Sequence, residues 1–170
     1  MESIRPIAGE ELDRLKPLWL ALQDHHMRIS PRLADLPKRS PQESWRRRRA
    51  KYARWLESED TFVLVSERDD ELVGYAFVTI EPGYASWDSG DQLAELETLS
   101  VAPAARGQGV GSRLLAAVRA RLASDGIAQL AVTSAVTNAE SHRFYERHGL
   151  NRAHIVFIGP SNPQTGLRTS

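Results

Sequence analysis

The most informative stretch of this chain reads Arg106-Gly107-Gln108-Gly109-Val110-Gly111-Ser112, with glycine at every second position. A β-like segment, 94–101, precedes it. A helical pattern follows it, formed by Val110, Leu114, Leu115, Val118 and Leu122. Glycines at a strand-to-helix junction let the backbone adopt positive φ and approach a ligand closely. A helix that starts there adds unpaired N–H groups and the positive end of its dipole. The stretch therefore predicts an anion site, most often one for phosphate.

The residues around the glycines argue against two common phosphate-binding motifs. A nucleotide-binding P-loop needs a lysine at the helix start, and Gly111-Ser112-Arg113 has none. A dinucleotide fingerprint needs a third glycine where Ser112 stands. What fits is Arg106-x-x-Gly109-x-Gly111 after a Leu-x-Val strand, which resembles the acyl-CoA site of the GNAT N-acetyltransferase superfamily. A glycine-rich turn without a ligand is the alternative that the loop alone leaves open.

Composition narrows the classes of protein. The chain has 170 residues, a length that favours one domain, and its hydrophobic and charged fractions are typical of a globular protein. Its formal net charge of zero gives no bulk electrostatic reason to bind nucleic acid or a membrane. The absence of cysteine excludes a disulfide framework, a thiolate metal site and a cysteine nucleophile, and it suits the cytoplasm. No set of side chains has metal-ligand spacing, so no metal site is predicted.

Hydrophobic periodicity and turn residues predict alternating strands and helices along the chain. Strands are expected at 3–7, 61–67, 71–80, 94–101, 127–134 and 153–158, and helices at 10–26, after the cap at Ser40, 109–124 and 137–148. This order predicts an α/β fold with a mixed, mostly antiparallel central sheet and helices on both faces. It is also the element order of the GNAT family. We expect a single domain over 1–158 and a flexible tail over 159–170.

A second motif adds to the resemblance. Asn138, Tyr145 and Gly149 stand at the offsets of the later GNAT motif, in which a tyrosine follows the asparagine by seven residues and a glycine by eleven. Ser141 and Leu150 depart from the usual alanine and phenylalanine, which affects packing rather than chemistry. The final strand region is shorter than is usual in the family. The wall on the acceptor side is therefore either open or completed by a partner subunit in a homodimer.

The resemblance implies acetyl-CoA as acyl donor, with its pyrophosphate on the loop amides and its pantetheine arm along the preceding strand. The residues that it assigns to the coenzyme are Leu99, Val101, Arg106, Gly107, Gln108, Gly109, Val110, Gly111, Ser112 and Asn138. Asn138 has a plainer alternative, since it could simply help to cap its helix.

Acetyl transfer to an amine needs a base for the amine and an acid for the leaving thiolate. Glu97 is the candidate base, because it shares the nominal strand face of Leu99 and Val101, and Glu95 is the second candidate. A bulge in the strand would change which of the two carboxylates points at the acceptor. Tyr145 resembles the general acid of the family, and a neutral phenol can donate to a thiolate. Plainer alternatives remain: a polar strand residue for Glu97 and a core aromatic for Tyr145.

The resemblance therefore implies an N-acetyltransferase that moves acetyl from acetyl-CoA directly to a primary amine, carried by a small molecule or a peptide. The first alternative is a non-catalytic acyl-CoA-binding or sensor domain of the same fold. The run from Arg46 to Arg49 raises a second alternative, a nucleic-acid-binding module, which the zero net charge disfavours. On a helix these arginines form mostly a solvated face. They could also bind the coenzyme's 3′-phosphate or an anionic acceptor.

Overall fold

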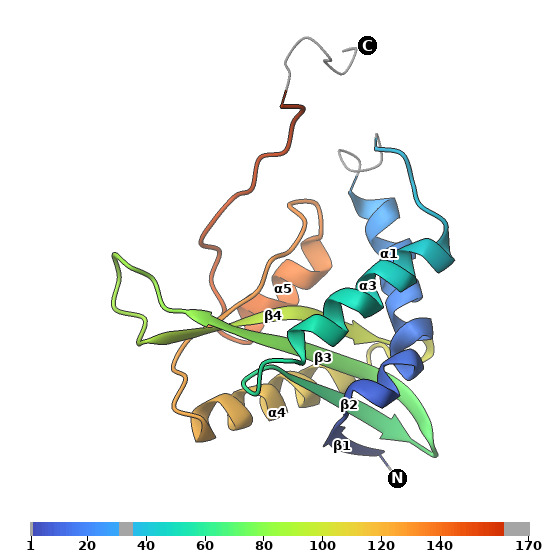
Figure 1. Ribbon diagram of the computed structural model, residues 1–170, viewed down its shortest axis with the longest axis horizontal. Coiled ribbons are helices and arrows are strands. Elements are labelled where there is room, and N and C mark those ends of the chain that lie inside the picture. Colours follow the sequence, from blue (N-terminus) through green and yellow to red (C-terminus); the bar gives the residue numbers. More distant parts are fainter. Residues whose placement is uncertain (1, 31–35, 162–170) are drawn as a thin grey trace.

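The computed structural model describes residues 2–30 and 36–161, which form a five-stranded sheet in the order β1-β2-β3-β4-β5 (Figure 1). The strands are β1 (Glu2–Pro6), β2 (Phe62–Arg68), β3 (Glu71–Pro82), β4 (Gln92–Val101) and β5 (Leu130–Ala131). The first four pair antiparallel, whereas β5 pairs parallel with β4. The predicted mixed, mostly antiparallel sheet is confirmed.

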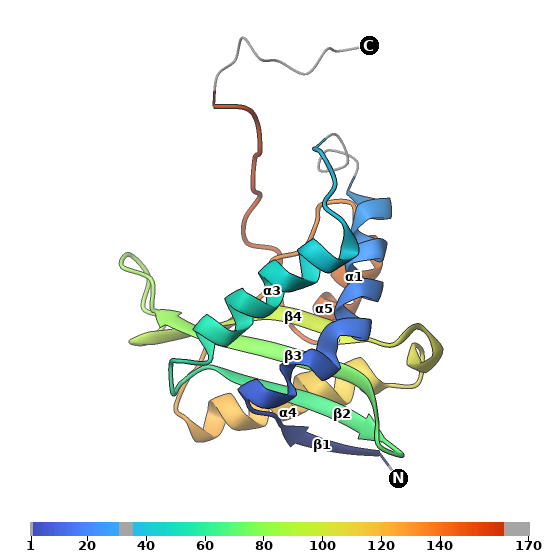
Figure 2. The same ribbon diagram turned by 45° about the vertical axis from the view of Figure 1, so that its right-hand side comes forward.

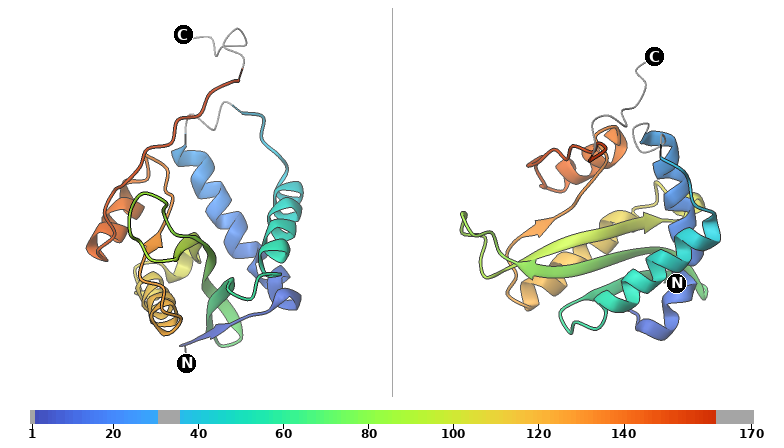
Figure 3. Two further views of the ribbon diagram at one scale, coloured as in Figure 1. Left: turned by 60° about the vertical axis from the view of Figure 1, so that its left-hand side comes forward. Right: turned by 45° about the horizontal axis from the view of Figure 1, so that its top comes forward.

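Helices cover both faces of this sheet. They are the 3-10 helix η1 (Gly9–Leu15), α1 (Lys16–Ile29), α3 (Pro41–Trp55), the 3-10 turn η2 (Pro103–Ala105), α4 (Val110–Ser124) and α5 (Ala139–Arg147). Helices α1 and α3 lie on one face and α4 lies on the other (Figure 2). The left view in Figure 3 separates α1 and α3 from α4 and α5 across the sheet. Each face therefore has its own apolar core.

The two cores differ in character. Under α4 the core is mainly aliphatic, with Leu114, Leu115 and Val118 packed among strand residues such as Leu96. Under α1 and α3 it is aromatic, and the Tyr52 ring stacks on Phe77 with ring centroids 4.0 Å apart. The Tyr52 hydroxyl is 2.7 Å from the Thr98 hydroxyl of β4, so a buried hydrogen bond ties α3 to that strand. Strand β4 is thus fixed from the α3 side of the sheet.

Local signals placed several boundaries correctly. The Ser40 hydroxyl accepts a hydrogen bond from the Glu43 amide at 3.2 Å, which confirms the predicted helix start. Asp69 and Asp70 both have positive φ in the two-residue turn of the β2–β3 hairpin, as a type I′ turn requires. Gly149, with φ of 78°, follows α5 as expected.

Other expectations were wrong. The helix predicted over 10–26 begins as the tighter η1 and becomes α-helical only at Lys16. Strand β5 is only Leu130–Ala131, much shorter than 127–134. Helix α5 begins at Ala139, after its cap Asn138, and not at 137. Residues 153–158 form no strand, because they have no pairing partner within 2–30 and 36–161, and they extend away from the sheet (Figure 1). Residues 162–170 of the expected tail lie outside the described residues.

In the described part of the chain, no helix has both the length and the apolar character needed to cross a membrane.

Candidate active site

The glycine loop forms an exposed helix start with no side-chain cap. Gly107 and Gly109 have φ of 74° and 77°, the left-handed region that favours glycine. Gly109 is the N-cap residue of α4 and supplies no side-chain hydrogen bond. The first amides of the helix, from Val110 to Ser112, are therefore free of a capping side chain. This geometry confirms the predicted helix start and suits an anion.

Side chains in and next to the loop anchor it to neighbouring elements and do not occupy the space in front of its amides. The Gln108 side chain donates to the Ala104 carbonyl at 2.9 Å and accepts from Arg68 at 3.1 Å. Arg113 donates to the Gln108 carbonyl at 3.0 Å and forms an ion pair with Glu2 at 2.6 Å. The loop is thus anchored to β1, β2 and α4, and the first amides of α4 are left for a ligand.

Strands β4 and β5 diverge beside this loop. Within the described residues they pair only through Ala94 with Leu130 and Glu95 with Ala131. From Leu96 to Val101, the edge of β4 opposite β3 therefore has no described strand partner. The Ser134 hydroxyl, just beyond β5, is buried without a hydrogen-bond partner. An open strand edge beside an uncapped helix start fits an extended amide-containing arm that ends in a pyrophosphate.

Helix α5 packs against the start of α4. Gly111 faces the Phe144 ring, and a Cβ added at this glycine would lie 3.6 Å from it, which is ordinary van der Waals contact. The His148 side chain bridges the same helices: Nδ1 donates to the Phe144 carbonyl at 2.8 Å, and Nε2 accepts from the Ser112 hydroxyl at 3.1 Å. No functional role was predicted for His148, because only the folded chain brings its side chain to the loop.

Two residues assigned from the second motif lie on α5. The side chain of Asn138 is buried and accepts from the Ser141 amide at 3.2 Å, which confirms its capping role. Tyr145 is half-buried against the aliphatic core, and burial raises the pKa of its phenol to about 12. Its hydroxyl has no hydrogen-bond partner among the described residues, so it is free to donate elsewhere.

A β-bulge positions Glu97. Phe77 of β3 faces Thr98 and the next residue, Val78, faces Leu96, so Glu97 is the unpaired extra residue. Glu97 and Thr98 consequently point to the same side and line one pocket. Leu99 and Val101 pack on the α4 side. The prediction that Glu97 shares their face was wrong, because the bulge reverses the alternation between them.

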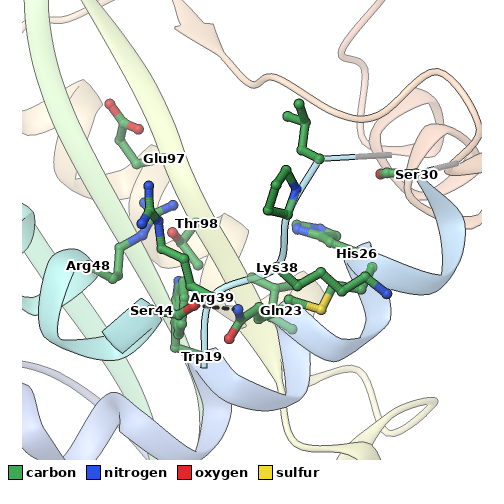
Figure 4. Close-up of a pocket in the computed structure, with 14 residues that line it drawn as sticks. Trp19, Gln23, His26, Ser30, Lys38, Arg39, Ser44, Arg48, Glu97 and Thr98 are labelled. Carbon is green, nitrogen blue, oxygen red and sulfur yellow. Dashed lines mark hydrogen bonds between the residues drawn. The ribbon is translucent and has the colours of Figure 1, made fainter. Parts of the chain in front are cut away.

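The pocket at Glu97 has a volume of about 310 Å³ and lies between α1, α3 and β4 (Figure 4). Glu97 accepts a hydrogen bond from the Thr79 hydroxyl at 3.1 Å. Glu95 does not line this pocket; it accepts from Thr133 at 3.2 Å, and burial raises its pKa. Tyr145 and Asn138 are also outside the lining. The described residues contain no group of three or more His, Asp or Glu side chains that could hold a metal ion.

Comparison with known proteins agrees with this geometry. A mycothiol acetyltransferase of Kocuria rhizophila is 28% identical over 160 residues, which cover 89% of this chain and 46% of that protein. An aminoglycoside N(6′)-acetyltransferase of Stenotrophomonas maltophilia is 31% identical over 109 residues, covering 63% of this chain and 71% of that protein. The chain thus spans less than half the length of the mycothiol acetyltransferase.

A solved GCN5-related N-acetyltransferase of Ralstonia eutropha has the same fold, with a TM-score of 0.74 at 17% identity; the match covers 95% of this chain and all of that one. The profile of the acetyltransferase (GNAT) family matches residues 30–150, which include the glycine loop, Glu97 and Tyr145. The chain therefore belongs to the acetyltransferase (GNAT) family.

Proposed function

We propose that this chain is an N-acetyltransferase that transfers the acetyl group of acetyl-CoA directly to a primary amine, through a domain spanning 1–158. The observation that carries this is the uncapped start of α4, with Gly107 and Gly109 at positive φ, beside an open edge of β4. The amides of Val110 to Ser112 would hold the pyrophosphate, and the edge at Leu99 and Val101 would pair with the pantetheine arm. When bound, acetyl-CoA supplies a thioester carbonyl as the electrophile.

The residues of this chain divide the proton transfers between them. Glu97, directly or through a water, takes a proton from the acceptor ammonium and passes it to solvent, which leaves a neutral amine to attack the thioester. As the new C–N bond forms and the C–S bond breaks, Tyr145 donates its phenolic proton to the leaving thiolate. A backbone N–H between Leu99 and Val101 meets the oxyanion that develops between these steps. Proton count balances, because one proton leaves the amine and one reaches the thiol.

Binding and turnover test the proposal separately. Titration calorimetry with acetyl-CoA should give micromolar binding, and an amine library should give free-thiol release with at least one class of acceptor. Coenzyme binding without release on any amine would favour the sensor alternative. Absence of binding would overturn the proposal at the glycine loop.

The general-acid role of Tyr145 makes a separate prediction. Tyr145→Phe should lower kcat roughly a hundredfold or more, because it removes the proton for the thiolate, while the Kd for acetyl-CoA stays unchanged. Because the phenol has a pKa of about 12, its ionisation should not shape the rate profile in the neutral and mildly alkaline range. Tyr84→Phe, in the exposed β3–β4 loop, is the control and should retain full activity. Equal activity of wild type and Tyr145→Phe would contradict the assignment.

We also propose that this chain is located in the cytoplasm, because its cysteine-free composition suits a reducing compartment.

We further propose that the chain forms a homodimer. The dimer proposal rests on the segment from Ile155 to Ile158, four consecutive large apolar residues that are all exposed, with Phe157 91% exposed. Tyr84 of the β3–β4 loop lies against His154, with ring centroids 6.4 Å apart, and extends this surface. A contiguous exposed apolar segment of high β-propensity is typical of an interaction site. Its proposed occupant is a second copy of this chain.

Substitution of Phe157 tests the dimer. Light scattering after size exclusion should give a dimer for wild type and a monomer for Phe157→Asp, because the charge would be buried unpaired in the interface. Val136→Asp is the control, since Val136 is also apolar and exposed but lies outside the segment. A monomeric wild type, or a dimer that survives Phe157→Asp, would refute the proposed interface.

A further inference from the structure

The four consecutive arginines of α3 differ in their ion-pair partners. Arg46 and Arg47 form ion pairs with Glu43 at 2.7 and 2.6 Å, and Arg49 pairs with Asp13 at 2.9 Å. Arg48 has no carboxylate partner within residues 2–30 and 36–161. Three of the four charges are thus compensated by neighbouring carboxylates, and the fourth is not.

Aromatic rings hold Arg48 in place. Its guanidinium carbon lies 5.6 Å from the ring centroid of Trp19 and 5.4 Å from that of Tyr52. Such contacts orient the planar group without neutralising it, because the rings contribute only their quadrupoles. Arg48 therefore presents a pre-positioned, uncompensated fork of N–H donors, the arrangement that binds carboxylate or phosphonate oxygens in pairs.

This fork lines the pocket that contains Glu97 (Figure 4). Arg39 lines the same pocket, is exposed, and also has no ion-pair partner in the described residues. In Figure 4 the side chains of Arg39 and Arg48 extend towards the end of the pocket occupied by Glu97, whereas Lys38 extends to the other side. Glu97 is the only carboxylate in the described lining, against three basic side chains at Lys38, Arg39 and Arg48.

The rest of the lining is uncharged apart from the titratable His26, and burial lowers the pKa of that imidazole, which favours its neutral form. Trp19, Leu22 and Met27 supply an apolar wall, and Gln23 is engaged with the Ser44 hydroxyl at 2.8 Å. A polycationic acceptor would face two guanidinium groups with one carboxylate to offset them. An acceptor that carries both an amine and an acid group would satisfy both ends of the pocket, with the amine at Glu97 and the acid at the arginines.

The coenzyme's own phosphates do not account for this basic wall. The loop that suits the pyrophosphate begins α4, whose side chains pack on the opposite face of the sheet from α1 and α3. Arg48 belongs to the α1–α3 face, where it lies over Trp19 and Tyr52. The two anion sites are therefore separated by the sheet, and the arginine site is left for the acceptor.

Building on the proposed acetyltransferase function, we infer that the acceptor is a small primary amine that also carries an anionic group, a carboxylate or a phosphonate, which Arg48 and Arg39 bind. Arg48 is then the residue that determines acceptor specificity. Arg46 and Arg47, which are paired with Glu43, have no part in this recognition.

Matched pairs of acceptors test the inference. Thiol release would be measured for amino acids against their amides and for aminoalkylphosphonates against amino alcohols of equal chain length, with kanamycin as a polycation. In the pair that the enzyme acetylates faster, the member with the acid group should have the higher kcat/KM. Arg48→Met should lower kcat/KM for the acid about tenfold to a hundredfold, because the substitution removes a charge-assisted hydrogen bond to the acid group. The same variant should leave kcat/KM for the neutral partner and KM for acetyl-CoA nearly unchanged.

Arg46→Met is the matched control, because it removes the same group from the same helix outside the pocket, and it should leave both members unaffected. Preferred turnover of amides, amino alcohols or kanamycin would overturn the inference while leaving the acetyltransferase proposal intact. If Arg48→Met lowered kcat/KM equally for both members of a pair, Arg48 would act through packing. If it raised KM for acetyl-CoA, Arg48 would act on the coenzyme. Either result would also overturn the inference. Failure of wild type to bind acetyl-CoA would instead refute the underlying function.

Discussion

Replacing Glu97 with glutamine is expected to lower kcat at neutral pH roughly a hundredfold to ten-thousandfold, because the amide cannot take a proton from the acceptor amine. Glutamine keeps the size of the side chain, and its carbonyl oxygen can still accept from Thr79, so the pocket should retain its shape. Activity of the variant should recover as the pH rises towards the pKa of the free amine, since the deprotonated amine needs no base. Steady-state rates across a pH series, with the Kd of acetyl-CoA as a reference, measure both effects.

Glu95→Gln is the matched control for this prediction. Glu95 is on the same strand and faces Thr133, away from the pocket lining, so its substitution should change kcat little. Burial raises the pKa of Glu95, a feature also found in catalytic carboxylates, which makes the comparison decisive. If Glu95→Gln lost the activity and Glu97→Gln kept it, the two assignments would have to be exchanged.

Gly109→Val should abolish measurable binding of acetyl-CoA. At φ of 77° a β-branched residue is strained by about 1–2 kcal/mol, and its Cβ would lie 3.0 Å from the Arg113 guanidinium that anchors the loop. The Arg113 side chain would be displaced and the strained backbone would relax, which misdirects the amides of Val110 and Gly111 that the pyrophosphate needs. Calorimetry should show a loss of affinity of at least about a hundredfold, equivalent to the loss of two charge-assisted hydrogen bonds.

Gly126→Val separates this effect from general strain. Gly126 follows the other end of α4 with φ of 75°, and a Cβ there would have no neighbour within 4 Å. Both variants should lose similar stability in thermal unfolding, but only Gly109→Val should lose coenzyme binding. Unchanged affinity in Gly109→Val would mean that the pyrophosphate lies elsewhere.

Much of the fold was readable from local signals. The helix start near Gly109, the Ser40 cap and the turn between the strands predicted at 61–67 and 71–80 depend on residues within a few positions of one another, and the structure confirms all three. The glycine loop belongs to the same category, because positive φ at Gly107 and Gly109 is a property of the residue type as much as of the fold. For such features the residue type and its short-range spacing are the physical cause.

Strand pairing was less predictable. Residues 153–158 have the β-branched and aromatic composition of a strand, but a strand exists only where another edge accepts its hydrogen bonds. The parallel pairing of β5 with β4 ends after Ala131, so in the described part of the chain β5 is too short to offer that segment an edge. The η1 helix at Gly9–Leu15 has a similar explanation. Leu12 and Leu15 are both fully buried against the aromatic core, and hydrophobic periodicity alone does not predict how tightly the helix must wind to pack them there.

The sequence by itself determined the order of elements as far as α5, the glycine loop and the identity of the two candidate proton-transfer residues, because each depends on residue type and short-range spacing. Only the tertiary structure decided how these residues face the acceptor. The bulge that places Glu97 beside Thr98 arises from the register between β3 and β4, which neither strand specifies alone. Likewise, four adjacent arginines are equivalent in the sequence, and Arg48 differs from the others only because Glu43 and Asp13 reach its neighbours while Trp19 and Tyr52 lie beneath it.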